Sequence, residues 1–257
     1  MAAKIIAITN QKGGVGKTTT AVNLSASLGA IKRKVLLIDL DPQGNASMGS
    51  GIRKEEINFS VADILLNLAP IHDVIKKTSV GYDLIPASSQ LIAAEVQLAK
   101  LNEREYFLRR ALKAISENYD FIFIDCPPAL NILTVNALVA STSVIIPIQC
   151  EYYALEGLAA LVSTISQLKA TVNSDLQIEG LLRTMYDGRN RLTLEVSEQL
   201  IKHFPDKVYK TVIPRNVRLA EAPSHGLPAL LYDHNSQGAM SYLALAGEIC
   251  KTTTQVK

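Results

Sequence analysis

A glycine-rich loop with two lysines follows a short apolar run near the start of the chain. It reads Gln11-Lys12-Gly13-Gly14-Val15-Gly16-Lys17-Thr18-Thr19. Glycine lets backbone N–H groups turn toward phosphate oxygens, and a helix beginning at Thr18 would add its dipole. Lys17 can reach the β- and γ-phosphates, and the Thr18 hydroxyl can bind Mg²⁺. The loop predicts a nucleoside triphosphate site, because a ligand-free glycine turn would not explain the Lys-Thr pair that follows it.

Two carboxylates follow other apolar runs at positions suited to the same ligand. Asp125 ends the run FIFID, a position from which a carboxylate holds Mg²⁺, here through water. Asp41 comes two residues after the end of the run KVLLID and can orient an attacking water or accept its proton. Asp-Pro-Gln-Gly is also a good turn sequence, so a turn role for Asp41 is the alternative. We expect Asp39 to support the magnesium shell or the loop.

A dinucleotide site is the main alternative for the glycine loop. Gly14-x-Gly16, with Asp39 at the end of the second apolar run, partly matches that fingerprint. Its third glycine would fall at Thr19, and Lys17-Thr18 would have no role. We therefore favour a nucleoside triphosphate. No Asn-Lys-x-Asp guanine motif occurs in the chain, which favours ATP.

Apolar runs typical of strands alternate with segments typical of helices along the whole chain. The expected strands are 4–9, 34–39, 82–85, 119–125, 144–149, 176–185 and 208–213. The expected helices are 18–30, 61–68, 71–77, 91–100, 103–118, 154–171, 192–204 and 237–251. This alternation predicts an α/β fold, a mostly parallel β-sheet with helices on both faces, in a single domain over residues 1–257. Ligands bind beyond the carboxyl ends of such strands, where the loop and both carboxylates fall.

The composition agrees with a globular protein that handles a small ligand. Of 257 residues, 48% are hydrophobic and 19% charged, which excludes a disordered chain. The formal charge of only +2 excludes a polycationic coat, and 5% aromatic residues argue against base stacking as the main activity. Three scattered cysteines suggest reduced thiols in a cytoplasmic protein. The uncharged stretch 126–150 contains three prolines, so we expect loop, buried helix and buried strand there, not a membrane span.

Taken together, these motifs closely resemble the deviant Walker A ATPases, and among them the ParA/Soj chromosome- and plasmid-partitioning ATPases. The first glycine of an ordinary P-loop is replaced by Gln11, and Lys12 is the extra lysine. Matching segments are 12–19, 39–45, 125–128, 149–157 and 213–219, and the resemblance spans roughly residues 4–250. It implies a P-loop NTPase fold and an ATPase that uses ATP and Mg²⁺.

The resemblance also implies roles for individual residues. Lys12 would reach across an ATP-induced homodimer to the partner's phosphates and, with Lys17 and Asp41, form the catalytic set. Nucleotide would be held by Lys12 to Thr19, with Thr18 and Asp125 at the metal. Glu151 matches a position that touches the partner's ribose. Pro214 would pack on the adenine, and the Asn216 amide can both donate to and accept from its edge.

Residues 183–218 hold a local excess of positive charge. They contain eight Lys and Arg and four acids, so the segment is +4 and the rest of the +2 chain is −2. A solvated charged face is the usual explanation for so small a patch; the resemblance favours non-specific double-stranded DNA instead. Arg189, Arg215 and Arg218 are the candidates, because we expect them in loops. The family further implies a ParB-like centromere-binding partner and a cytoplasmic, nucleoid-associated location.

Three other functions remain to be compared. A MinD-type membrane-cycling ATPase would need a basic amphipathic C-terminal helix, and residues 251–257 show no apolar face. An iron–sulfur scaffold would need paired cysteines, whereas nothing pairs with Cys126. A regulatory binder with an inactive site is disfavoured by the complete set Lys12, Lys17, Thr18, Asp41 and Asp125.

Overall fold

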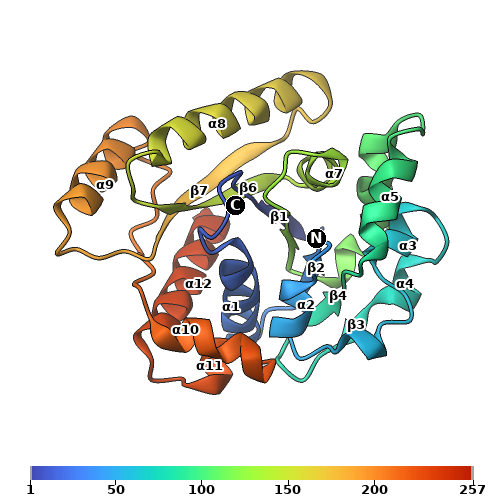
Figure 1. Cartoon of the computed structure of the whole chain (residues 1–257), viewed down its shortest axis with the longest axis horizontal. Coiled ribbons are helices and arrows are strands. Elements are labelled where there is room, and N and C mark those ends of the chain that lie inside the picture. Colours follow the sequence, from blue (N-terminus) through green and yellow to red (C-terminus); the bar gives the residue numbers. More distant parts are fainter. Residues whose placement is uncertain (1, 256–257) are drawn as a thin grey trace.

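The computed structural model describes residues 2–255, with side chains described through residue 251. Seven strands form one sheet in the order β3-β4-β2-β5-β1-β6-β7 (Figure 1). Their bounds are β1 Lys4–Ile8, β2 Val35–Asp39, β3 Lys76–Lys77, β4 Asp83–Ile85, β5 Phe121–Asp125, β6 Ser143–Gln149 and β7 Gln177–Thr184. All neighbouring strands are parallel except β3, which runs antiparallel to β4. The expected mostly parallel sheet is confirmed.

Helices cover both faces of this sheet (Figure 1). One face carries α1 Lys17–Ala30, α2 Asn45–Gly49, α10 Val217–Glu221, α11 Ala229–Tyr232 and α12 Gln237–Gln255. The other carries α3 Val61–Leu65, α4 Ile71–Val74, α5 Gln90–Leu98, α6 Phe107–Leu112, α7 Ile132–Ala140, α8 Ala154–Thr171 and α9 Arg191–His203. No helix in the described part of the chain is long and apolar enough to cross a membrane.

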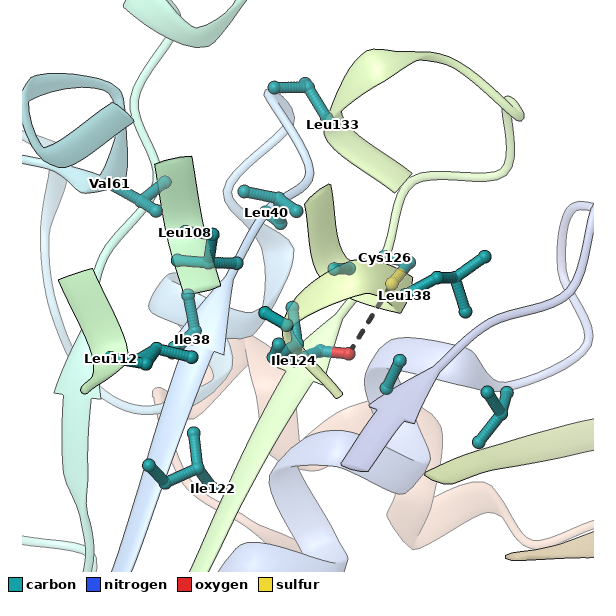
Figure 2. Close-up of a cluster of buried hydrophobic side chains, with 14 of the residues drawn as sticks. Ile38, Leu40, Val61, Leu108, Leu112, Ile122, Ile124, Cys126, Leu133 and Leu138 are labelled. Atoms are coloured by element: carbon teal, nitrogen blue, oxygen red, sulfur yellow. Dashed lines mark hydrogen bonds between the residues drawn. The ribbon is translucent and has the colours of Figure 1, made fainter. Parts of the chain in front are cut away.

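The apolar runs are continuous because the central strands are buried on both faces. All five residues of β2 are buried; Leu36 and Ile38 point into one core cluster, Val35 and Leu37 into the other. This division follows from the alternation of side chains along a strand. Figure 2 shows the first cluster, in which Ile38 and residues of β5 meet side chains of α6 and α7. The sheet is thereby held rigid beneath the loops that follow its strands.

Two expected elements differ because side chains capture their backbone groups. The expected helix 103–118 is interrupted: Asn136 of α7 accepts from the N–H of Leu108 and donates to the carbonyl of Arg104. Within the described structure, the expected strand 208–213 makes one isolated bridge to β7, between Val208 and Leu181, and a second bridge joins Tyr186 to Pro214 just beyond it. There the Arg183 guanidinium binds backbone carbonyls, and the Glu248 carboxylate accepts from two backbone N–H groups. Helix 71–77 is also shorter than expected, since Lys76–Lys77 forms β3.

Candidate functional site

The carboxyl ends of three adjacent strands bring the predicted residues together. In the sheet register, Ile8 of β1 and Asp39 of β2 both lie opposite Asp125 of β5. The glycine loop follows β1, and Asp41 comes two residues after β2. The clustering expected from the sequence is therefore confirmed by the strand order, which places β5 between β2 and β1.

The glycine loop has the backbone shape of an anion cradle. Gly14 and Gly16 have φ of +74° and +87°, a region that side chains other than glycine rarely adopt. Gly16 directly precedes α1, so the first N–H groups of that helix lie at the loop. A Cβ added at Gly13 would meet no atom within 4 Å. Nothing within the chain therefore requires glycine at position 13.

Lys17 is positioned for an anionic ligand and is almost withdrawn from water. Its side chain is buried, and its Nζ donates to the carbonyl of Lys12 at 3.4 Å. Burial lowers the pKa of Lys17, an effect opposed mainly by the nearby carboxylate of Asp125. A bound phosphate would favour the charged form of Lys17, because an anion close to an ammonium group raises its pKa.

Asp125 is the strongest indication of a metal in the described structure. It is fully buried, and neither carboxylate oxygen has a hydrogen-bond partner. Burial raises its pKa well above the ordinary value, and the charge of Asp39 acts in the same direction. The neighbouring Thr18 hydroxyl and the Lys17 ammonium act in the opposite direction, although the hydroxyl does not reach hydrogen-bond geometry. An unpaired buried carboxylate beside a threonine hydroxyl fits Mg²⁺, which binds few protein groups besides phosphate and water.

No set of three or more His, Cys, Asp or Glu side chains in the described chain could hold a metal by itself. Any cation would therefore depend on nucleotide oxygens as further ligands. Cys126 and Cys150 are buried thiols, and Cys250 is partly buried. Burial raises the pKa of Cys150 to about 11, so this thiol is protonated at neutral pH. The cysteines do not form the paired, accessible ligands that an iron–sulfur cluster needs.

Asp39 supports the loop that follows β2 through hydrogen bonds. Its Oδ2 accepts from both the N–H and the hydroxyl of Ser47, each at 2.7 Å, and its Oδ1 accepts from the N–H of Asp41 at 3.2 Å. Burial nevertheless raises its pKa to about 6. The Ser47 hydroxyl also accepts from the N–H of Ala87, so the segment 41–47 is fastened to the sheet. Nothing in the sequence singled out Ser47.

Asp41 lies at the mouth of the site. Its Oδ1 accepts from the N–H of Gln43 at 3.0 Å, and its carbonyl accepts from the N–H of Gly44. These bonds form the turn that the alternative interpretation expected. The side chain is nevertheless partly exposed and lies near Lys17 and Asp125, because its negative charge contributes to raising the pKa of both groups. The geometry is thus compatible with both a turn role and a role toward water.

Lys12 does not reach into its own phosphate loop. Its Nζ forms an ion pair with Oε2 of Glu151 at 2.7 Å, and its backbone N–H donates to Asn10. The two side chains are 39% and 47% exposed. Next to Glu151, Tyr152 and Tyr153 are 76% and 69% exposed. Lys12 therefore lies at a surface that carries accessible aromatic side chains.

A cavity of about 250 Å³ beside the glycine loop contains the predicted base-binding residues. Pro214 and Asn216 line it, together with Thr184, Met185 and Tyr242. The Oδ1 atom of Asn216 is buried and has no partner, so it is available to accept a hydrogen bond. Sequence reasoning missed the last three of these residues; Tyr242, on α12, hydrogen-bonds Thr20 of α1 at 3.0 Å.

A larger hollow of about 920 Å³ lies on the other side of α1. It reaches from Thr18 and Thr19 past Met48 to Arg53 and His225. It contains neither Pro214 nor Asn216. The predicted base-binding residues therefore line the smaller cavity.

The three candidate arginines are surface residues, and two of them form ion pairs. Arg189 makes a two-pronged ion pair with Asp187, both distances being 2.9 Å. Arg218 pairs with Glu221 and Asp233. It lies on α10 and not in a loop as expected. Arg215 is exposed and, with Arg189, lines a hollow of about 790 Å³ that shares Pro214 and Asn216 with the base cavity.

One member of the basic segment does not contribute to its surface. Arg183 is only 8% exposed and donates to the Ser197 hydroxyl and the carbonyls of Tyr209 and Lys210. It anchors the segment that follows α9. The surface charge is therefore smaller than the sequence count suggested.

A parallel sheet with a glycine-rich phosphate loop after β1 and carboxylates after β2 and β5 defines a P-loop nucleoside triphosphatase. A family model described as an AAA domain matches residues 3–178. The chain is 58% identical over 247 residues to the sporulation initiation inhibitor protein Soj of Bacillus subtilis, covering 96% of this chain and 98% of that protein. It is 50% identical to the chromosome partitioning protein ParA of Myxococcus xanthus over 98% of this chain and 89% of that one.

A solved structure agrees with these sequence relatives. Cobyrinic acid a,c-diamide synthase from Mycobacterium smegmatis, with a bound ATP analogue and magnesium, superposes with a TM-score of 0.87 at 34% identity. The match covers 99% of this chain and 97% of that one. The chain belongs to the ParA/Soj family of chromosome-partitioning ATPases.

Proposed function

We propose that this ATPase partitions DNA by a cycle in which ATP induces a homodimer, the dimer binds DNA without sequence preference, and hydrolysis releases it. The chain hydrolyses ATP to ADP and phosphate and uses Mg²⁺. In this proposal residues 1–257 act as a single ATPase domain. The observation that carries it is the position of Lys12, which is turned away from its own phosphate loop toward an exposed surface.

The nucleotide is held by the phosphate loop, by side chains that bind the metal and by the base cavity. The N–H groups of residues 13–19 and the Lys17 ammonium bind the phosphates. Thr18 and Asp125 hold Mg²⁺, Asp125 through water, and the ion neutralises charge on the β- and γ-phosphates when bound. Pro214 packs on the adenine, and Asn216 accepts from its amino group through the unpaired Oδ1.

Hydrolysis needs a water and a second cation. Asp41 orients the attacking water, because its carboxylate is partly exposed beside Lys17 and Asp125. Lys12 of one protomer leaves Glu151 and stabilises the charge on the phosphate bound by the other. Glu151, once released, contacts the ribose across the interface. The exposed Tyr152 and Tyr153 beside it provide apolar area for that interface.

DNA binding belongs to the surface of residues 183–218. Arg189, Arg215 and Arg218 contact phosphates and not base edges, so the dimer does not select a sequence. The loop 214–216 lines both the cavity proposed for the base and the hollow containing Arg189 and Arg215, which supports a DNA surface close to the proposed nucleotide site. A ParB-like protein stimulates hydrolysis, and the cargo is a chromosome or plasmid. The cycle places the protein in the cytoplasm, on the nucleoid.

The test measures dimerisation and DNA binding together. Light scattering follows the mass of the wild type and of Lys12→Ala with ATP, and gel shifts use unrelated duplexes with and without a slowly hydrolysed ATP analogue. We expect an ATP-dependent dimer, lost in Lys12→Ala, and DNA binding only by that dimer. Equal DNA binding without nucleotide, or strong preference for one duplex, contradicts the proposal.

A liposome sedimentation assay in the same buffers addresses the MinD-type alternative. ATP-dependent binding to vesicles containing anionic lipid, with none to DNA, would replace partitioning by membrane cycling. That alternative depends on the end of the chain. The structure describes no side chains from residue 252 onward.

A further inference from the structure

The carbonyl of Val15 lies inside the phosphate loop and needs a hydrogen-bond donor. Val15 is 1% exposed and stands between Gly14 and Gly16, both at positive φ. A loop that turns its N–H groups toward an anion must turn intervening carbonyls away from it. A buried carbonyl without a donor is costly, so the protein has to supply one from elsewhere.

That donor is Thr184, from the far edge of the sheet. Its hydroxyl donates to the Val15 carbonyl at 2.8 Å, and its side chain is 2% exposed. Thr184 ends β7, which is separated from β1 by β6. Its methyl group also lies near the loop, 3.8 Å from the position that a Cβ on Gly16 would occupy.

The backbone around Thr184 is fixed on both sides. Thr184 is paired with Gln149 at the end of β6. The carbonyl of Arg183 accepts from the N–H of Ile213, and the N–H of Tyr186 donates to the carbonyl of the same Ile213. Met185 follows in a left-handed conformation, φ +48°, which is rare for a residue other than glycine. Such strained positions cluster at ligand sites.

We propose that Thr184 is a positioning residue for the phosphate cradle, because its hydroxyl holds the Val15 carbonyl away from the bound phosphates. Asn10 makes the corresponding attachment to β6, donating to the carbonyl of Pro147 and accepting from the N–H of Lys12. The loop is thus attached to both strands on that side of β1. Thr184 lies outside every nucleotide motif of the sequence, and the inference rests on the nucleotide site proposed above.

Loss of the hydrogen bond between Thr184 and Val15 should weaken nucleotide binding without slowing hydrolysis by the saturated enzyme. If the Val15 carbonyl is free to turn inward, its negative oxygen faces the phosphates. The binding of ADP and the binding of ATP are then weakened to the same extent. Removing this bond should raise both dissociation constants by about five- to tenfold. The turnover of saturated enzyme should stay within about twofold, because an interaction made equally before and during reaction leaves kcat unchanged.

The experiment compares Thr184→Val, which keeps the shape but removes the donor, with Thr184→Ser, which keeps the donor. Calorimetric titration with ADP, a slowly hydrolysed ATP analogue and inorganic triphosphate gives the dissociation constants, and steady-state assays give kcat. We expect weaker binding of all three ligands by the valine variant and near wild-type binding by the serine variant. If the valine variant does not fold, Thr184→Ala against Thr184→Ser isolates the same hydroxyl.

Thr142→Val is the control, since the Thr142 hydroxyl donates to the carbonyl of Ile5 at the opposite end of β1. It should leave every dissociation constant unchanged. Equal binding by the valine and serine variants overturns the proposal. So does unchanged affinity for inorganic triphosphate with weakened ADP, which would make Thr184 a base contact. Failure of wild-type protein to bind any nucleotide would instead refute the proposed function.

Discussion

The Nζ of Lys12 lies 2.7 Å from Oε2 of Glu151, so in the single chain the extra lysine of the loop is bound by a residue 139 positions away. Gln149 donates to the other oxygen of the same carboxylate. The ion pair is about half exposed, and such pairs contribute roughly 0–1 kcal/mol. A contact this weak can hold Lys12 in the monomer and still be given up when a partner's phosphate becomes available.

Replacing Glu151 separates its two proposed roles. Glu151→Gln removes the charge that holds Lys12 but keeps an oxygen and an amide for the ribose, so the ATP dimer should form at roughly two- to fivefold lower protein concentration. Glu151→Ala loses the ribose contact as well and should dimerise less readily than Glu151→Gln. Light scattering over a protein dilution series measures both. If the two variants form the ATP dimer with the same midpoint protein concentration, the division of roles is disproved.

Asp41→Ala should produce an ATP-bound dimer that does not turn over. Lys17, Thr18 and Asp125 still hold the nucleotide, whereas the oriented water is lost. Turnover should fall at least about a hundredfold, as expected for loss of a general base. Phosphate release measures turnover, and the dimer should persist on DNA in gel shifts. A variant that no longer binds ATP would show that the turn made by Asp41 is its main role.

Ser47→Ala tests whether the support of Asp39 matters for catalysis. The change removes one donor to the Asp39 carboxylate and the acceptor of the Ala87 N–H, so the free energy of unfolding should fall by about 1–3 kcal/mol. We expect kcat to fall while the dissociation constant for ATP stays constant, because the loop 41–47 loosens and the phosphate cradle does not.

Ser50→Ala is the matched control for this prediction. Ser50 is also buried on the α2 segment and bonds the carbonyl of Ala46 and the Tyr82 hydroxyl, but not Asp39. It should reduce stability without lowering kcat. Equal loss of kcat in both variants would mean that general loosening, and not Asp39, is responsible.

Asp125→Asn should stabilise the nucleotide-free protein at neutral pH while abolishing hydrolysis. Because burial raises the pKa of Asp125, the folded chain binds this proton more tightly than the unfolded chain does. Stability therefore falls as pH rises above the unfolded value of about 4 toward the folded one. Every tenfold difference in proton affinity between the two states corresponds to about 1.4 kcal/mol, a cost that asparagine avoids.

Thermal melting without nucleotide, from pH 5 to pH 8, measures this effect. The advantage of Asp125→Asn over the wild type should grow as pH rises. Adding ATP and Mg²⁺ should reverse the order, since the ion then offsets the buried charge. Parallel melting curves at all pH values would show that Asp125 is satisfied without a metal.

The charges around Arg189 should tune DNA binding. Asp187 holds Arg189, and Arg189 lowers the pKa of Asp187 to about 2, so the acid remains charged at any working pH. Arg189→Ala should reduce the slope of log affinity against log salt by roughly 2 in the dimer, one contact per protomer. Asp187→Asn should raise affinity severalfold, because it frees the arginine. Fluorescence anisotropy with a labelled duplex at several salt concentrations measures both.

The control for charge alone is Lys169→Glu, which lies at an exposed position on α8, outside residues 183–218. It should change DNA affinity much less than Arg189→Glu, although both alter the net charge by two. Similar losses in the two variants would indicate that DNA responds to net charge and not to this surface.

Much of the site follows from the sequence by itself. Gly14 and Gly16 were expected to allow the turned backbone and do so at positive φ, and Asp41 and Asp125 were expected after strands and lie there. These features are local: the torsional freedom of glycine and the apolar runs of buried parallel strands are properties of neighbouring residues. The carboxyl ends of parallel strands then have to meet at one edge of the sheet.

The tertiary structure alone decided which distant groups meet. The bond from the Thr184 hydroxyl to the Val15 carbonyl and the bond from the Ala87 N–H to the Ser47 hydroxyl have no signal in the sequence. The same holds for residues 208–213, an expected strand whose backbone is bound in part by the side chains of Arg183 and Glu248. The physical reason is that a donor and an acceptor as far apart as Thr184 and Val15, 169 positions, are brought together by strand order and chain crossovers, which the pattern of neighbouring residues does not specify.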